Sequence, residues 1–371
     1  MALFEKYLTE FLDSEMKKYN MPGYDCSIYH HHKEVYRHSN GFADLGSKRP
    51  ITKNTLYNIY SNTKVITCVA ALQLYEQGKF LLEDSLDRFY PEFEHMKIKT
   101  AQGIKDAETP IRIKDLFCMA AGFASGDGLK DVCVKFQKET AGECPVSEMP
   151  NYLAQIPLEF EPGSHYSYGI CHDVLGALVA KISGKRFSEY LEDNIFRPLE
   201  MENTGFYIEK LKSDNLATQY RYNGLEKDIT NEGARNCLVP PVMKESGGGG
   251  LITTVDDYMK FQEALCKGNV ILRKSTIELM RLDHLNEAQR RDYGCADTGM
   301  SYGLGVRTTI NQAKCGAPVG FGPFGWSGAA GSYGAIDPEN ELTIFYVQHM
   351  FNTDSLRTHN ILRNIVYSFL E

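Results

Sequence analysis

The feature that most constrains the fold is a segment of nearly continuous apolar character between residues 62 and 77. Its apolar side chains would cover almost the whole circumference of a helix, and Gly78 follows where a left-handed residue ends many helices. A helix that is apolar all round lies inside a molecule rather than on its surface. The sequence therefore predicts one buried helix that the remaining elements must enclose.

The segments on either side of this helix differ in their periodicity. Apolar residues recur at helical spacing near both ends of the chain, and aromatic and β-branched runs predict strands. The expected helices cover residues 3–18, 255–266 and 355–369, and the expected strands cover 24–36, 331–336 and 342–349. Helix and strand at both ends, with helices between them, predict a fold of the mixed α/β (α+β) class.

The length of the chain bears on its domain organisation. At 371 residues it exceeds the roughly 250–300 residues at which one hydrophobic core stops growing. We expect a single domain over residues 1–371 that is built from two lobes. The α/β lobe would take residues from about 1–85 and 240–371, and a helical lobe would take about 86–239.

Composition excludes several classes of partner. The net charge of −8 argues against nucleic-acid binding, which usually needs a basic face, and no stretch approaches the ~18–20 apolar residues of a membrane span. The first twenty residues lack the uninterrupted apolar run of an export signal, and the ten cysteines form no Cys-x-x-Cys pair. We therefore expect a cytoplasmic protein with reduced thiols. Its oligomeric state cannot be read from the sequence.

Ser61 and Lys64 stand at the start of the buried helix, three residues apart and hence on one helical face. A serine hydroxyl is a weak nucleophile until a neighbouring base accepts its proton. An amine held against apolar walls loses its own proton more readily and can serve as that base. Ser61 is therefore either a nucleophile or an ordinary helix N-cap. A second Ser-x-x-Lys begins at Ser14, late in the first helix, and we interpret it as helix surface.

A rival serine lies in Gly299-Met300-Ser301-Tyr302-Gly303, which matches the Gly-x-Ser-x-Gly nucleophile elbow. That elbow needs a strand before its serine and a helix after it. Gly303 and Gly305 lie close to the serine, and residues 304–310 end in a β-branched run that predicts a strand. The match is therefore interpreted as chance.

Two further clusters are candidates for the site. Tyr166 and Tyr168 follow Pro162-Gly163, and a phenol beside a lysine cation can relay protons, although core packing is the usual role of a tyrosine. The run from Gly325 to Gly331 contains the only tryptophan, Trp326, and its small residues allow a substrate to lie against the backbone. Trp326 could equally be a core anchor.

The sequence His30-His31-His32 suggests a metal site at first sight. In a strand, however, successive side chains alternate between faces and cannot converge on one ion. We therefore expect no metal.

Taken in order, these motifs resemble the serine β-lactamase/penicillin-binding-protein superfamily, and specifically its class C-like branch. That branch includes carboxylesterases, D-stereospecific peptidases and β-lactamases. The likeness covers nearly the whole chain and rests on five segments: residues 54–64, 161–168, 195–206, 249–257 and 328–338. It implies a β-lactamase/transpeptidase-like fold, with an antiparallel sheet flanked by helices and an all-helical lobe alongside.

The resemblance also implies roles for individual residues. Ser61 is matched to the nucleophile, Lys64 to its base and Tyr166 to the proton relay. The oxyanion hole is matched to the backbone N–H groups of Ser61 and Ala329. The implied chemistry is a two-step acyl transfer on a small-molecule substrate, without a cofactor. The residues matched to substrate binding are Tyr168, Trp326, Ser327 and Gly328.

Two departures from the family pattern bear on the substrate. β-Lactamases of this class carry Lys where this chain has Trp326, and Asn where it has Tyr168. A tryptophan offers a stacking wall in place of an ion pair with a substrate carboxylate. The resemblance thus favours a carboxylesterase acting on small neutral or apolar esters, with little β-lactamase activity. A β-lactamase, a D-aminoacyl amidase or peptidase, and a penicillin-binding sensor or inactive binding module stay open as alternatives.

Overall fold

An eight-stranded antiparallel sheet forms the centre of the molecule. The computed structural model describes residues 2–123, 127–206, 213–294, 297–320 and 322–369. The strand order is β10-β11-β12-β13-β14-β1-β2-β3. The strands are β1 (Gly23–His30), β2 (Lys33–Asp44), β3 (Arg49–Pro50), β10 (Met300–Tyr302), β11 (Arg307–Thr309), β12 (Phe324–Gly325), β13 (Tyr333–Asp337) and β14 (Leu342–Val347). The pairing of β1 with β14 joins the two ends of the chain in one sheet.

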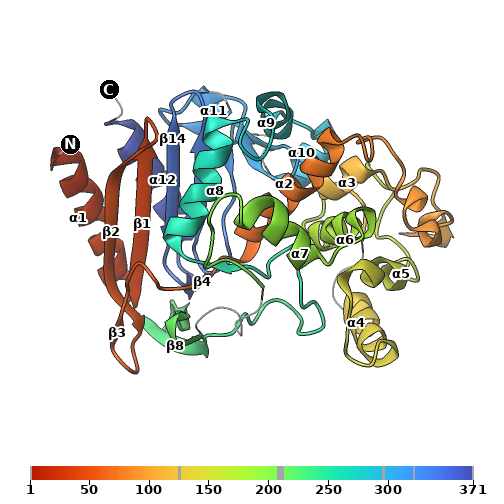
Figure 1. Cartoon of the computed structure of the whole chain (residues 1–371), viewed down its shortest axis with the longest axis horizontal. Coiled ribbons are helices and arrows are strands. Elements are labelled where there is room, and N and C mark those ends of the chain that lie inside the picture. The colour runs from red at the N-terminus through yellow and green to blue at the C-terminus, as the bar shows by residue number, and fades with distance from the viewer. Residues whose placement is uncertain (1, 124–126, 207–212, 295–296, 321, 370–371) are drawn as a thin grey trace.

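Helices cover both faces of this sheet (Figure 1). Helices α1 (Ala2–Lys18) and α12 (Ser355–Tyr367) lie on one face, and α8 (Val255–Lys267) lies on the other. Strand β14 shows why, because its side chains alternate: Ile344 and Tyr346 belong to the core under α1 and α12, whereas Phe345 and Val347 belong to the core under α8. The antiparallel sheet flanked by helices, predicted from the resemblance, is confirmed.

The buried helix predicted for residues 62–77 is α2 (Thr63–Glu76). From Val65 to Leu72 every residue is buried, and Gly78 has the expected positive φ of 70°. Helix α6 (Cys171–Ser183) packs against α2, and α3 (Ile113–Phe117) packs against α6. No helix in the described part of the chain is long and apolar enough to cross a membrane.

The remaining elements are shorter. The middle third, predicted to be mainly helical, also contains two hairpins, β5–β6 and β7–β8. Strands β5 and β6 have mostly exposed side chains, so burial imposes no apolar alternation that the sequence would reveal. The other helices are α4 (Asp127–Glu139), α5 (Met149–Leu153), α7 (Phe187–Leu191), α9 (Lys274–Arg281), α10 (Glu287–Tyr293) and α11 (Gln312–Cys315). The other strands are β4 (Tyr57–Asn58), β5 (Lys97–Thr100), β6 (Gly103–Asp106), β7 (Gln219–Asn223), β8 (Asp228–Gly233), β9 (Ile252–Thr253) and β15 (Met350–Phe351).

The histidine run departs from the sequence-based expectation. Strand β1 ends at His30, and His31 and His32 form the turn to β2, with φ values of 51° and 59°. The argument that three imidazoles alternate along one strand is therefore wrong. A two-residue hairpin turn with positive φ at both positions reverses the chain there instead.

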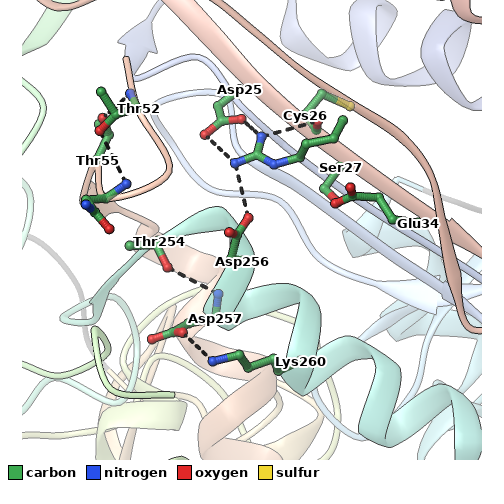
Figure 2. Close-up of polar contacts among 12 residues, drawn as sticks. Asp25, Cys26, Ser27, Glu34, Thr52, Thr55, Thr254, Asp256, Asp257 and Lys260 are labelled. Atoms are coloured by element: carbon green, nitrogen blue, oxygen red, sulfur yellow. Dashed lines mark hydrogen bonds and ion pairs between the residues drawn. The ribbon is translucent and has the colours of Figure 1, made fainter. Parts of the chain in front are cut away.

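A partly buried arginine, Arg37, joins the sheet to α8, and Figure 2 shows its two acidic partners, Asp25 and Asp256. The guanidinium of Arg37, on β2, contacts the carboxylate of Asp25 on β1, which is 1% exposed, and reaches Asp256 in the first turn of α8 at 3.1 Å. Thr254 caps the same helix by accepting a hydrogen bond from the Asp257 N–H. A buried carboxylate needs such a partner, because an unpaired charge inside a protein is strongly destabilising.

We expect Arg37→Met to lower the free energy of unfolding by about 3–5 kcal/mol, since it leaves the Asp25 charge buried and unpaired. Urea unfolding followed by circular dichroism measures the change. Arg197→Met is the matched control, because that arginine pairs with Asp193 at the surface, where ion pairs contribute little. A double variant, Arg37→Met with Asp25→Leu, should recover most of the loss. Equal stability of Arg37→Met and the control would contradict the prediction.

Candidate active site

The backbone is strained immediately before Ser61. Tyr60 has a φ of 47°, a left-handed conformation that is costly for an aromatic residue. Its hydroxyl donates to the side chain of Gln219, and its ring packs on Phe351, so tertiary contacts hold it in place. Ser61 follows in a short 3₁₀ segment that runs into α2. The N-cap of α2 is Asn62, without a capping side-chain hydrogen bond. Ser61 is therefore not a conventional helix cap.

The ammonium group of Lys64 is buried beside the hydroxyl of Ser61. The side chain is 4% exposed, and Nζ lies 3.3 Å from Ser61 Oγ. Nζ also donates to the carbonyl of Gly248, and the ring of Tyr168 faces it at 4.7 Å from the centroid. Within the described residues Lys64 has no ion pair with a carboxylate, so neutral acceptors and a ring face surround the amine. Such a group is poised to exchange a proton with the serine hydroxyl.

One residue of the segment Ser-Gly-Gly-Gly-Gly at positions 246–250, called the glycine run below, connects Lys64 to a buried carboxylate. The Gly248 N–H donates to Asp173 Oδ1 at 3.1 Å, while its carbonyl accepts from Lys64. Ser246 Oγ donates to the same carboxylate oxygen at 2.6 Å. Burial raises the pKa of Asp173, and the Ser246 hydrogen bond and the Lys64 charge oppose that rise. Asp173 thus positions the segment that accepts from Lys64.

Steric contact explains why this segment is glycine. A Cβ at Gly248 would lie 2.5 Å from Asp173 Oδ2, and one at Gly247 would lie 2.4 Å from the His172 carbonyl. Real Cβ atoms do not approach neighbours so closely. The backbone of this segment therefore lies in close contact with the start of α6.

The two tyrosines of the Tyr166–Tyr168 motif occupy different surroundings. The ring of Tyr166 packs edge-on against Tyr293 and Tyr302, with centroids 5.0 and 5.5 Å away. Burial raises the pKa of its phenol, the opposite of the lowering expected beside an ammonium. In the described part of the chain Tyr166 makes no hydrogen bond to Ser61 or Lys64. Tyr168 is the tyrosine that contacts Lys64, through its ring face.

Trp326 and Tyr168 form an aromatic wall next to Lys64. Their rings stack with centroids 5.8 Å apart, and the indole Nε1 donates to the Tyr168 hydroxyl at 3.1 Å. The neighbouring hydroxyl of Ser327 accepts from Arg307 at 3.4 Å. Gly328 lies against the Ile59 carbonyl, where a Cβ would clash at 2.4 Å. Ala329 is exposed, and its N–H has no acceptor among the described residues. Residues 326–329, called the strand segment below, therefore run directly alongside the turn that carries Ser61.

Asn62 is a site residue that the sequence argument missed. It is fully buried next to the nucleophile candidate. In the amide orientation that satisfies its neighbours, it donates to the Trp326 carbonyl at 3.0 Å and accepts from Gly328 N and Ser332 Oγ at 3.3 and 2.8 Å. This amide joins the start of α2 to the strand segment. The sequence signal that could have indicated Asn62 was a polar residue inside an otherwise apolar segment. Its partner Ser332 lies 270 positions away in the chain.

The rival serines lie elsewhere. Ser301 is buried on β10 and donates to Asp283 at 2.5 Å, and strand β11 rather than a helix follows it. Ser14 donates to the Phe11 carbonyl at an exposed position of helix α1. The nine cysteines in the described residues are free thiols, and Cys295 lies outside those residues.

Comparison with known proteins agrees with this arrangement. The family model named Beta-lactamase matches residues 8–367. The chain belongs to the Beta-lactamase family. The family predicted from the motifs is thereby confirmed, and with it the coarse assignment to the serine hydrolases of that family.

Several relatives are similar over most of their length. Protein Rv1367c of Mycobacterium tuberculosis is 30% identical over 83% of this chain and 81% of its own. Esterase EstB of Burkholderia gladioli is 25% identical over 89% of this chain and 86% of its own. The solved structure of EstCE1, described as a hydrolase with promiscuous acyltransferase activity, has a TM-score of 0.81 at 24% identity and covers 98% of each chain. This last likeness shows the shared fold.

The contacts of Asp173 generate a prediction. Asp173→Asn keeps the shape of the side chain but weakens its hold on Gly248 and Ser246, so that the acceptor of Lys64 shifts. We expect kcat for the chain's hydrolase reaction to fall by ~10–100-fold with little change in KM, because displacement of a reacting group by about 1 Å can cost ~100-fold.

Asp115→Asn is the matched control, since Asp115 is equally buried but accepts from the backbone N–H of Arg112 at the start of α3. Steady-state kinetics and thermal melting of both variants separate positioning from stability. A loss in Asp173→Asn that is matched by an equal loss in the control would overturn the positioning role.

Proposed function

We propose that this protein is a carboxylesterase that acts through a covalent acyl-enzyme on Ser61. The observation that carries the proposal is the 3.3 Å contact between Lys64 Nζ and Ser61 Oγ, with the amine buried and unpaired with any described carboxylate. A buried amine without a carboxylate partner has a chemical use, because ordinary buried lysines are either paired or excluded from the interior.

The reaction would proceed in two steps. Lys64 acts in its neutral amine form. Ser61 Oγ attacks the ester carbonyl carbon while its proton passes to that amine, and the resulting oxyanion lies against the N–H groups of Ser61 and Ala329. The carbon–oxygen bond to the alcohol then breaks, and the alcohol leaves with the proton that Lys64 returns through Tyr166. A water molecule then attacks the acyl carbon, and its proton passes through Tyr166 to the Lys64 amine. The bond between the acyl carbon and Ser61 Oγ breaks, Lys64 returns that proton to Oγ, and the acid leaves.

The aromatic wall supports neutral or apolar esters as substrates. Trp326 and Tyr168 present stacked ring faces beside Lys64, where β-lactamases of the resembling branch carry a cation and an amide. Aromatic faces favour apolar acyl or alcohol groups and offer no ion pair to a carboxylate. Similarity to Esterase EstB supports ester hydrolysis.

A fluorophosphonate probe and a substrate panel test the proposal together. We expect the probe to label the wild-type protein but not Ser61→Ala, and we expect short p-nitrophenyl esters to be hydrolysed with a kcat at least ~10⁴-fold above that of Ser61→Ala. Ser301→Ala is the control serine and should label normally. Turnover of nitrocefin as efficient as that of the esters would favour a β-lactamase. A failure of the wild type to label would favour a binding module.

The two tyrosines can be distinguished by removal of their hydroxyls. We expect Tyr166→Phe to lower kcat by ~10²–10⁴-fold, the usual loss when a general acid–base group is removed. Tyr168→Phe should change kcat less than tenfold, because its ring face, rather than its hydroxyl, contacts Lys64. Single-turnover kinetics with a p-nitrophenyl ester provide the comparison. The reverse order of effects would assign the relay to Tyr168.

A further inference from the structure

Three side chains with metal-binding atoms meet where the β1–β2 turn touches α8. His32 comes from the turn, and Glu263 and Cys266 come from one face of α8, three residues apart. Their ligand atoms all lie within 4.8 Å of one another. Glu263 and Cys266 are 7% and 4% exposed, and such burial is unusual for a carboxylate. The cluster is open to solvent only at His32, whose side chain is 28% exposed.

The partners of each group fix its orientation toward the others. Glu263 Oε1 accepts from the hydroxyl of Thr343 at 2.6 Å, so that Oε2 is turned toward His32 Nδ1, 3.0 Å away. The Cys266 thiol lies 3.7 Å from the Asp337 carbonyl. Hydrogen bonding to the rear oxygen of a ligating carboxylate is the usual outer-shell arrangement of a metal site.

We propose that His32, Glu263 and Cys266 bind a zinc ion. One thiolate, one imidazole and one carboxylate form a ligand set that zinc accepts, and the thiolate and imidazole disfavour magnesium and calcium. The fourth position would be filled by water. Glu341 Oε1 lies 3.9 Å from His32 Nε2, the ring nitrogen that does not face Glu263, and can orient the imidazole from outside the site.

The geometry requires a small adjustment. Zinc–ligand bonds of 2.0–2.3 Å place neighbouring ligands of a tetrahedral site about 3.4–3.6 Å apart. The His32–Glu263 pair is already slightly closer than that. The thiol would move inward by about 1 Å, which a rotation of the Cys266 side chain supplies.

Binding would also move a proton. Burial, together with the charges of Glu263, Asp337 and Glu341, raises the pKa of Cys266 to about 12, against a smaller opposite effect of Lys267. The thiol therefore carries its proton at neutral pH and releases it when the metal–sulfur bond forms.

The ion would connect the β1–β2 hairpin to α8. Helix α8 also contacts the candidate active site, because the Tyr258 hydroxyl donates to the Asn62 carbonyl at 3.1 Å. The proposed zinc site involves none of Ser61, Lys64 or Tyr166. The role of the metal is therefore structural, and it stabilises the folded state in proportion to its binding.

Cobalt(II) titration of the full-length protein under reducing conditions tests the proposal. We expect a thiolate-to-cobalt charge-transfer band at one equivalent, its disappearance on addition of zinc, and a higher melting temperature with zinc than with EDTA. Cys266→Ser should abolish the charge-transfer band, and Cys144→Ser, at an equally buried but distant thiol, should retain it.

Two further variants keep the test decisive if Cys266→Ser does not fold. His32→Asn, at a turn position that asparagine tolerates, should weaken cobalt binding by at least ~100-fold, and Thr343→Val should weaken it by ~10–100-fold through Glu263. A wild-type protein without the band at millimolar cobalt, or a band that persists in Cys266→Ser, would overturn the proposal. Labelling of Ser61 by fluorophosphonate does not depend on either result.

Discussion

A single buried ammonium organises this structure. Lys64 lies on a helix that is enclosed on all sides, and a charge there is tolerated only with acceptors around it. The acceptors are the Ser61 hydroxyl and the Gly248 carbonyl, and the Tyr168 ring covers the remaining side. Gly248 in turn is held by Asp173, so that a carboxylate on α6 stabilises the amine through one glycine residue. Hydrogen bonds from Lys64 to Gly248 and from Gly248 to Asp173 thus link α2, the glycine run and α6.

The candidate site is assembled from segments far apart in the sequence. The serine turn is strained at Tyr60, and distant side chains hold that strain: Gln219 on β7 and Phe351 on β15. The amide of Asn62 joins the turn to the strand segment that carries Trp326. Strain of this kind persists only where the surroundings over-determine it, which is typical of functional sites. The aromatic wall then replaces a charged anchor, and this replacement directs the proposed chemistry toward neutral esters.

Much of the architecture could be predicted because its signals are local. Helices α1, α2, α8 and α12 follow from apolar periodicity, and β13 and β14 from β-branched and aromatic runs about a turn. The pairing of Ser61 with Lys64 needs only one helical turn. The β5–β6 hairpin escaped prediction because its mostly exposed strands carry no apolar alternation. The histidine turn escaped it because His31 and His32 adopt a conformation that favours glycine and asparagine.

The sequence by itself determined the buried helix, the residues at its start and the family to which the chain belongs, since each of these depends on neighbours within a few positions. Tertiary structure decided which tyrosine faces Lys64, which carboxylate supports the glycine run, and how the Asn62 amide joins the two sides of the site. It also brought His32 next to Glu263, which is 231 positions away in the chain. The physical reason is common to all of these: such contacts depend on how whole elements pack, and no residue pattern on one element specifies its partner on another.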